Sequence, residues 1–189
     1  MLFLITYIFL LRLPSEALPI VRGVNGVADQ GQLIKKKAVL YLHDEQLCLK
    51  LSSRKNRPQG SLLKRGCWCK SANFLVCPVH VVWPYVSHFA VGQSVFEGIY
   101  PGLAINTLRK YMGLLEKPNA KKYISHDIRR GHADDLRRSG ATLYEILTAG
   151  EWSSPAFLSY LDIDSLEADA VLEAHIDDSS SDDQDSGGD

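Results

Sequence analysis

The chain opens on a run of apolar residues. Met1–Leu11 contains no charged residue, and Arg12 and Pro14 follow it directly. A signal peptide carries a basic residue before its apolar stretch and a small-residue cleavage site after it, and this run has neither. We therefore interpret it as a buried helix already under way at Met1 and ending around Pro14 to Glu16, and we expect a protein that is not secreted.

Short β-type runs follow between Ala38 and Cys69. They are Val39–Leu42, Leu47–Leu51 and Ser61–Cys69. The breaks between them are His43–Glu45 and the polar segment Arg54–Gly60, which contains proline and glycine. Such breaks are typical of hairpin connections, so the pattern predicts a small antiparallel sheet with two hairpins.

After Pro101 the pattern becomes helical, with well-marked boundaries. We expect helices over Leu103–Leu115, from Ser125 to about Arg138 with a stop at Gly140, from a Thr142–Glu145 capping box to Gly150, from Ser154-Pro155, and over Leu166–His175. The predicted fold class is α+β, mainly helical with a small antiparallel sheet.

The length of 189 residues favours one compact domain, and no apolar run reaches the roughly 20 residues of a membrane span. The net charge of -1 hides an uneven distribution: all 21 Lys and Arg residues lie at or before Arg138, while half of the 22 Asp and Glu residues follow Leu161. A basic body suggests a polyanionic partner, with nucleic acid as the first candidate. The final residues, 177–189, contain no apolar side chain and predict a disordered acidic tail.

The most informative segment runs from Ser125 to Asp162. His126 and Arg129 are three residues apart, so they share a helix face, and they lie in the first turn, where free backbone N–H groups favour a phosphate. Trp152 follows at the end of a predicted helix, and Tyr160 lies on the next.

This segment resembles the C-terminal box of the tyrosine recombinases, the phage integrase family. The shared elements are His126-x-x-Arg129, the stretch Arg-Gly-His-Ala-Asp-Asp-Leu, Gly140, the Ala-Gly-Glu-Trp turn and Tyr160. Trp152 stands where most of the family has histidine and where its Cre-like branch has tryptophan. The resemblance implies a recombinase catalytic domain over residues 1–176, without the helical DNA-clamping domain that the family places before it.

The resemblance also implies further site residues upstream. The family's first arginine lies at the end of a buried helix in a pattern like Leu-Arg-x-Ser-Glu, which Leu11–Glu16 offers with one extra residue, so Arg12 and Glu16 are the candidates. The family's lysine lies in a β-hairpin turn, and Lys55 is the candidate, although the nearby Lys50, Arg54 and Arg57 could also face phosphates.

In the implied reaction, the Tyr160 hydroxyl attacks a DNA phosphodiester and forms a 3′-phosphotyrosyl bond, and a second strand's 5′-hydroxyl reverses the step. Arg12 and Arg129 would stabilise the transition-state charge, and Lys55 would protonate the leaving oxygen. His126 would handle the tyrosine proton or bind the phosphate, Trp152 would donate its indole N–H to it, and Glu16 would orient the basic groups. The reaction requires no catalytic metal.

The sequence departs from the family at two further points. Trp152 and Tyr160 are eight residues apart, where the Cre-like pattern has nine, and Pro14 interrupts the arginine box. Because of the shortened spacing and the missing DNA-clamping domain, a non-enzymatic DNA-binding remnant is the first alternative. The second is a secreted or zinc-braced interaction protein in which the recombinase pattern is accidental.

Four residues outside that pattern form a candidate metal set. Cys67, Cys69, Cys77 and His80 supply three thiolates and an imidazole, the donors of a tetrahedral structural zinc site. The alternative is three half-buried thiols on a strand and loop. We expect such a zinc to brace an insert at residues 61–85 without taking part in chemistry.

The expected partner is double-stranded DNA, and no membrane is implied. We also expect a homo-oligomer on DNA, because Leu166–His175 has an apolar component that it cannot easily bury alone and family members dock this helix on a neighbouring protomer. The implied compartment is the nucleus in a eukaryote and otherwise the cytoplasm.

Overall fold

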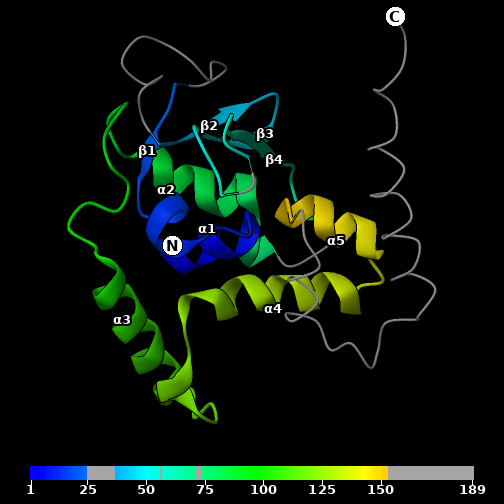
Figure 1. Cartoon of the computed structure of the whole chain (residues 1–189). Helices are drawn as coiled ribbons and strands as arrows, with labels where there is room; N and C mark the ends of the chain where they lie inside the picture. Colours follow the sequence, from blue (N-terminus) through cyan, green and yellow to red (C-terminus); the bar gives the residue numbers. More distant parts are fainter. Residues whose placement is uncertain (25–36, 56, 71–73, 153–189) are drawn as a thin grey trace, which may run out of the picture. The chain divides into compact units, whose positions relative to one another are not determined.

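The computed structural model describes residues 1–24, 37–55, 57–70 and 74–152. The fold is mixed α+β with one four-stranded sheet in this described part (Figure 1). The chain divides into two compact units, Met1–His132 and Ala133–Asp189, which are described separately. The predicted helices from Ser154 and over Leu166–His175, Tyr160 and the acidic tail lie outside the described residues.

The apolar N-terminal run is buried, but its helix is shorter than the sequence suggests. Helix α1 spans Leu2–Ile8. Leu10 then takes a left-handed conformation with φ of 51°, which ends the helix before the expected boundary at Pro14 to Glu16. The next residues form a π-helical turn, Leu13–Ala17, with the proline in its first turn. A π-helical turn accommodates one more residue than an α-helical turn, which provides room for Pro14.

The sheet has strand order β1-β2-β3-β4. Strands β2 (Ala38–His43), β3 (Gln46–Leu51) and β4 (Ser61–Arg65) form the two predicted antiparallel hairpins. Strand β1 (Ile20–Arg22), which the sequence pattern did not indicate, pairs in parallel with β2. The expected third run, Ser61–Cys69, is too long, because strand β4 ends at Arg65 and Cys67 and Cys69 lie beyond it.

The two faces of the sheet bury different clusters. Residues alternate along a strand, so Ala38 and Leu40 join the main core with α1, while Val39 and Tyr41 pack with Val21 and Cys48 on the other face. The main core of the first unit includes fully buried side chains from the N-terminal helix, the sheet and the turns, among them Ile5, Phe9, Leu13, Leu49 and Val82.

Short helical segments follow the sheet. They are the 3-10 turn Phe74–Val76, the π-helical turn Pro78–Val82 and α2 (Trp83–Ser87). The longer helix α3 (Pro101–Leu114) comes next, and the 3-10 turn Ala120–Lys122 follows it. Helix α4 (Ser125–Arg138) begins in the first unit and continues into the second. Within the described ranges, no helix is long and apolar enough to span a membrane.

The second unit confirms the helix boundaries that its sequence predicts. Gly140 has φ of 86°, in the left-handed region, after the end of α4. Helix α5 (Leu143–Gly150) begins with the expected capping box, in which the Thr142 hydroxyl accepts from the Glu145 backbone and the Glu145 carboxylate accepts from the Thr142 backbone N–H.

Candidate functional site

The first group of site residues begins at the end of α1. The Arg12 side chain is 22% exposed, and its guanidinium lies 3.2 Å from the Glu16 carboxylate. The Glu16 carboxylate also accepts a hydrogen bond of 2.8 Å from the backbone N–H of Arg12. This bond spans the start of the π-helical turn, which Arg12 precedes and Glu16 belongs to. The extra residue Pro14 therefore does not prevent a contact between Arg12 and Glu16.

Arg54 completes this cluster from the hairpin between β3 and β4. Its guanidinium donates two hydrogen bonds of 3.1 Å to the two oxygens of Glu16 and a third, of 3.3 Å, to the carbonyl of Leu10. Both Arg54 and Glu16 have side chains that are only 3% exposed. Bidentate pairing with a buried carboxylate explains why arginine occupies this position. Arg54 thus ties the hairpin to the chain just after α1, a role that the sequence pattern did not indicate.

Lys55 follows Arg54 at the tip of the hairpin. The backbones of Arg54 and Arg57 pair in both directions, with N···O distances of 2.8 and 3.1 Å, so the chain turns tightly between them. Lys55 is exposed in this turn. The anchored Arg54 fixes where the turn begins, and the long Lys55 side chain extends from it into solvent.

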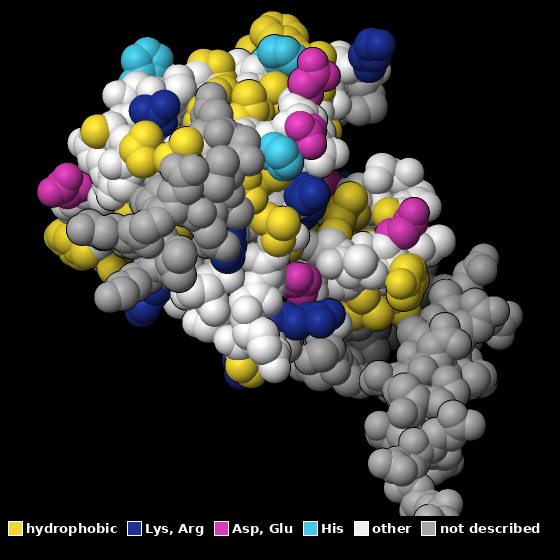
Figure 2. Space-filling view, turned by 90° about the horizontal axis from the view of Figure 1, so that it is seen from above, with side chains coloured by type: hydrophobic (Ala, Val, Ile, Leu, Met, Phe, Trp, Pro, Cys, Tyr) yellow, Lys and Arg dark blue, Asp and Glu magenta, His cyan; other side chains and the backbone are white. Residues whose placement is uncertain are grey.

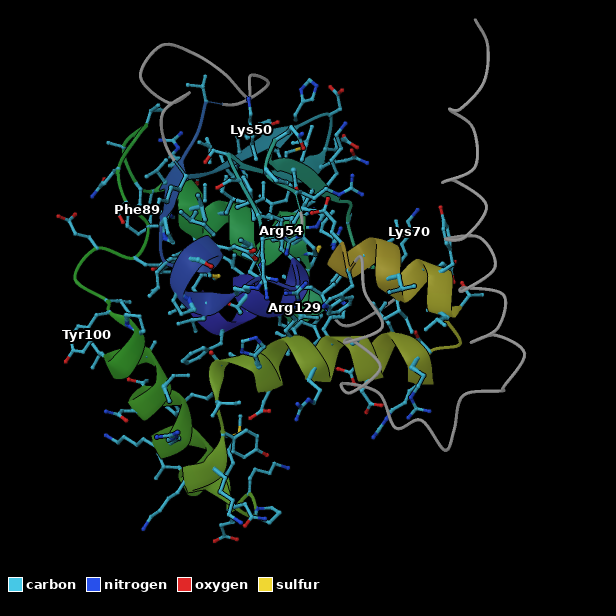
Figure 3. All side chains as sticks on the ribbon, in the orientation of Figure 1. Lys50, Arg54, Lys70, Phe89, Tyr100 and Arg129 are labelled. Carbon is cyan, nitrogen blue, oxygen red and sulfur yellow. The ribbon has the colours of Figure 1, made fainter. Side chains whose placement is uncertain are left out.

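The second group lies in the first two turns of α4. Arg129 is 4% exposed, and His126 is exposed. Partial burial lowers the pKa of His126 below its ordinary value, and the nearby charges of Arg129, Arg12 and Arg130 lower it further. Arg12 and Arg129 are far apart in the sequence, but the charges of both lower the pKa of the same imidazole. Arg54 and Arg129 are labelled in Figure 3, in the central part of the view near α1.

The other two candidates lie outside the described part of the first unit. Trp152 follows α5 in the second unit, and its backbone N–H donates to the carbonyl of Leu147. Tyr160 lies outside the described residues. Their roles stay predictions from the sequence.

Two aromatic contacts on α4 were not expected from the sequence. His132, which is 6% exposed, stacks on Tyr7 of α1 with ring centroids 4.3 Å apart. Its Nδ1 donates a hydrogen bond to the Tyr7 carbonyl, since a carbonyl can only accept. His132 also meets the edge of Trp68 at 6.2 Å. Its position three residues after Arg129, on the same helix face, is the signal that could have drawn attention to it.

Cys67, Cys69, Cys77 and His80 lie together and could hold a metal ion. Their donor atoms all fall within 4.8 Å of one another. The three Sγ atoms lie 3.2 to 3.4 Å from the Nδ1 of His80, and those of Cys67 and Cys77 are 3.8 Å apart. Burial raises the pKa of the Cys77 thiol, but hydrogen bonds from the backbones of His80 and Trp68 outweigh it and lower the pKa to about 6.

Local geometry explains how these donors meet. The π-helical turn Pro78–Val82 begins directly after Cys77 and carries His80 back toward the thiols. Cys67 and Cys69 follow Arg65, whose guanidinium donates to the Ile8 carbonyl at 3.0 Å and lies over the Phe9 ring. The start of the cysteine segment is therefore fixed to the end of α1.

The surface charge gives a broader picture. On the face shown in Figure 2, Lys and Arg side chains are dispersed among hydrophobic and acidic ones. The basic excess of the sequence therefore does not gather into one patch on that face, and the specific cluster around His126 is the more informative feature.

Comparisons with models of protein families, with curated proteins and with solved structures found no match for this chain.

Proposed function

We propose that this protein cleaves and rejoins DNA strands through a 3′-phosphotyrosyl intermediate, as the tyrosine recombinases do. The observation that carries the proposal is that the charges of Arg12 and Arg129 both lower the pKa of His126, although the two arginines come from opposite ends of the first unit's sequence. Two permanently charged guanidinium groups beside an imidazole can stabilise the negative charge that builds on a phosphodiester as it becomes pentacoordinate.

In the proposed reaction, the hydroxyl oxygen of Tyr160 forms a bond to phosphorus as the bond to the 5′-oxygen breaks. Lys55 donates a proton to that leaving oxygen, and His126 accepts the tyrosine proton or hydrogen-bonds the phosphate. Arg12 and Arg129 bind the non-bridging oxygens, and Trp152 adds its indole N–H. The reverse step uses the 5′-hydroxyl of a second strand, so bond energy is conserved without a nucleotide cofactor.

The contacts of Glu16 support this arrangement. One buried carboxylate holds the Arg12 guanidinium on one side and the Arg54 guanidinium on the other. Because a single carboxylate balances only one positive charge, the pair of arginines keeps an attraction for an anion. The geometry thus supports a preorganised phosphate-binding group in which Arg12 keeps the more exposed position.

A nicked suicide duplex tests the proposal, because loss of the short cleaved fragment traps the covalent protein–DNA adduct. We expect an adduct with the natural sequence and none with Tyr160→Phe, while non-covalent DNA binding stays nearly unchanged, because only the nucleophilic oxygen is lost. Tyr144→Phe, at an exposed tyrosine of α5, is the matched control and should form the adduct normally.

The eight-residue spacing from Trp152 to Tyr160 favours a second candidate, a DNA-binding protein without cleavage activity. Such a protein would bind the duplex and form no adduct at all. An adduct that persists in Tyr160→Phe would instead place the nucleophile elsewhere and contradict the proposed role of this tyrosine.

For the cysteine cluster, we propose a structural zinc ion. Tetrahedral zinc with Zn–S distances of about 2.3 Å and a Zn–N distance of about 2.0 Å places sulfur atoms about 3.8 Å apart and sulfur and nitrogen about 3.5 Å apart. The separations of 3.8 Å between Cys67 and Cys77 and of 3.2 to 3.4 Å to His80 fit this set closely. Four protein donors leave no open position, which favours a structural ion over a catalytic one. Elemental analysis should find one zinc per chain, and a metal-free purified protein would contradict this.

A further inference from the structure

Trp68 is held on both sides by the candidate metal ligands. It lies between Cys67 and Cys69 in the sequence, and its own backbone N–H donates to the Sγ of Cys77 at 3.3 Å. An ion bound by these thiolates would therefore fix the backbone of Trp68 from three directions. The Trp68 side chain is half-buried and packs against the main core of the first unit.

The Trp68 ring is directed at α4. It meets the His132 imidazole edge to face, with the ring planes at 76°. On the other side of His132, the Tyr7 ring stacks with the planes only 13° apart, and the Tyr7 carbonyl accepts the imidazole N–H. His132 is thus enclosed between α1 and the cysteine segment, and its rotation is limited by three contacts of different direction.

His132 lies one helical turn after Arg129 and two turns after His126. The backbone hydrogen bonds of a helix transmit a change at one turn to its neighbours, so a fixed His132 also fixes the turn that carries Arg129. Arg129 is almost fully buried, and a small displacement of its backbone would move its guanidinium relative to His126.

We propose that metal binding to Cys67, Cys69, Cys77 and His80 positions the first half of α4 through the contact of Trp68 with His132. Trp68 and His132 are then positioning residues, and the metal site controls how well Arg129 and His126 are ordered. This inference rests on the proposed zinc site and does not depend on the proposed DNA cleavage. It assigns the zinc a role beyond holding its own segment together.

Backbone hydrogen exchange, measured on the full chain with and without zinc, tests this proposal. We expect zinc removal to speed exchange in residues 125–132 by at least about tenfold, while the sheet residues 38–51 keep their protection. The zinc-loaded Trp68→Ala variant should show the same selective loss, because it keeps all four ligands and lacks the ring that touches His132. Trp83→Ala is the matched control, since Trp83 also packs on the core but lies outside the metal segment.

Three results would overturn the proposal. One is wild-type protection of residues 125–132 in zinc-loaded Trp68→Ala, and another is equal loss of protection in the sheet and in α4 on zinc removal. The third is a Trp68→Ala protein that takes up no zinc, because the tryptophan would then belong to the metal site and would not link it to α4. None of these readouts requires DNA, so a failure here is distinct from a failure to form the covalent adduct.

Discussion

The arginine cluster and the cysteine cluster of the first unit are built in opposite ways. Cys67 to His80 is a short stretch whose donors meet through local turns, and three of the four ligands are exposed. Arg12, Arg54 and Arg129 come from three distant segments, and Arg54 and Arg129 are buried. A local, exposed cluster depends on a metal for its rigidity, whereas a dispersed, buried one depends on the core that holds its segments.

Because the two clusters are held together differently, we expect substitutions in each to affect different properties of the protein. In the arginine cluster, ion pairs and hydrogen bonds within the protein already hold the buried charges, so we expect substitutions there to affect both folding and the proposed anion binding. In the cysteine cluster, the four residues lie outside the sheet, so we expect substitutions there to affect first the proposed metal binding. Trp68, from the cysteine segment, contacts His132, which lies on the same helix as Arg129.

The largest effect on stability is expected for Glu16→Gln. The substitution leaves the buried Arg54 guanidinium without its carboxylate, and breaking a buried ion pair from one side costs about 3–5 kcal/mol. Urea denaturation measures the change in the free energy of unfolding. Glu45→Gln, at an exposed turn residue, is the control and should stay within about 0.5 kcal/mol of the natural sequence. A loss of less than about 1 kcal/mol for Glu16→Gln would show that the pair contributes little.

The next effect is expected for Cys77→Ser, the buried member of the metal set. Loss of one thiolate should weaken zinc binding by more than about 100-fold, which competition with a chromogenic chelator can measure. Cys48→Ala supplies the control, because this fourth cysteine is buried on the other face of the sheet and lies outside the cluster. Equal zinc affinity in Cys77→Ser would remove this residue from the ligand set.

A smaller effect is expected for Arg12→Ala, read in DNA binding. Loss of one phosphate contact should weaken duplex binding roughly tenfold and reduce the salt slope of the binding constant by about one unit. Fluorescence anisotropy over a salt series measures both quantities. Arg138→Ala, with a side chain 70% exposed at the end of α4, should change the slope less. Identical slopes for the natural sequence and Arg12→Ala would mean that Arg12 has a structural role only.

Sequence patterns predicted the local features of this protein better than the distant ones. The hairpins, the Thr142 capping box and the gathering of the three cysteines with His80 follow from spacing within a few residues. The early end of α1 did not, because nothing in an unbroken apolar run marks the left-handed Leu10. The three-residue strand β1 is also too short to give a pattern, and its parallel partner lies on the far side of a long connection.

In the candidate site, too, the sequence predicted local features better than contacts between distant residues. The spacing of His126 and Arg129 on one helix turn was evident, but the bond between Arg54 and Glu16 joins residues 38 positions apart and depends on how the hairpin packs on α1. Among several cations near the turn, no sequence pattern distinguishes the buried Arg54 from the exposed Lys55. Only the packing shows which of them holds the scaffold.

The central claim is that Arg12, Arg129 and His126 form a phosphate-binding group, and the titration of His126 tests it most directly. Burial and the neighbouring arginines lower the pKa of His126, and a bound phosphate anion should raise it again. DNA binding would then take up a proton and strengthen as the pH falls through the range between the two pKa values. Histidine NMR with and without duplex DNA should show a lowered pKa that rises on binding, whereas a pKa that is ordinary in the free protein, or unchanged by DNA, would contradict the claim.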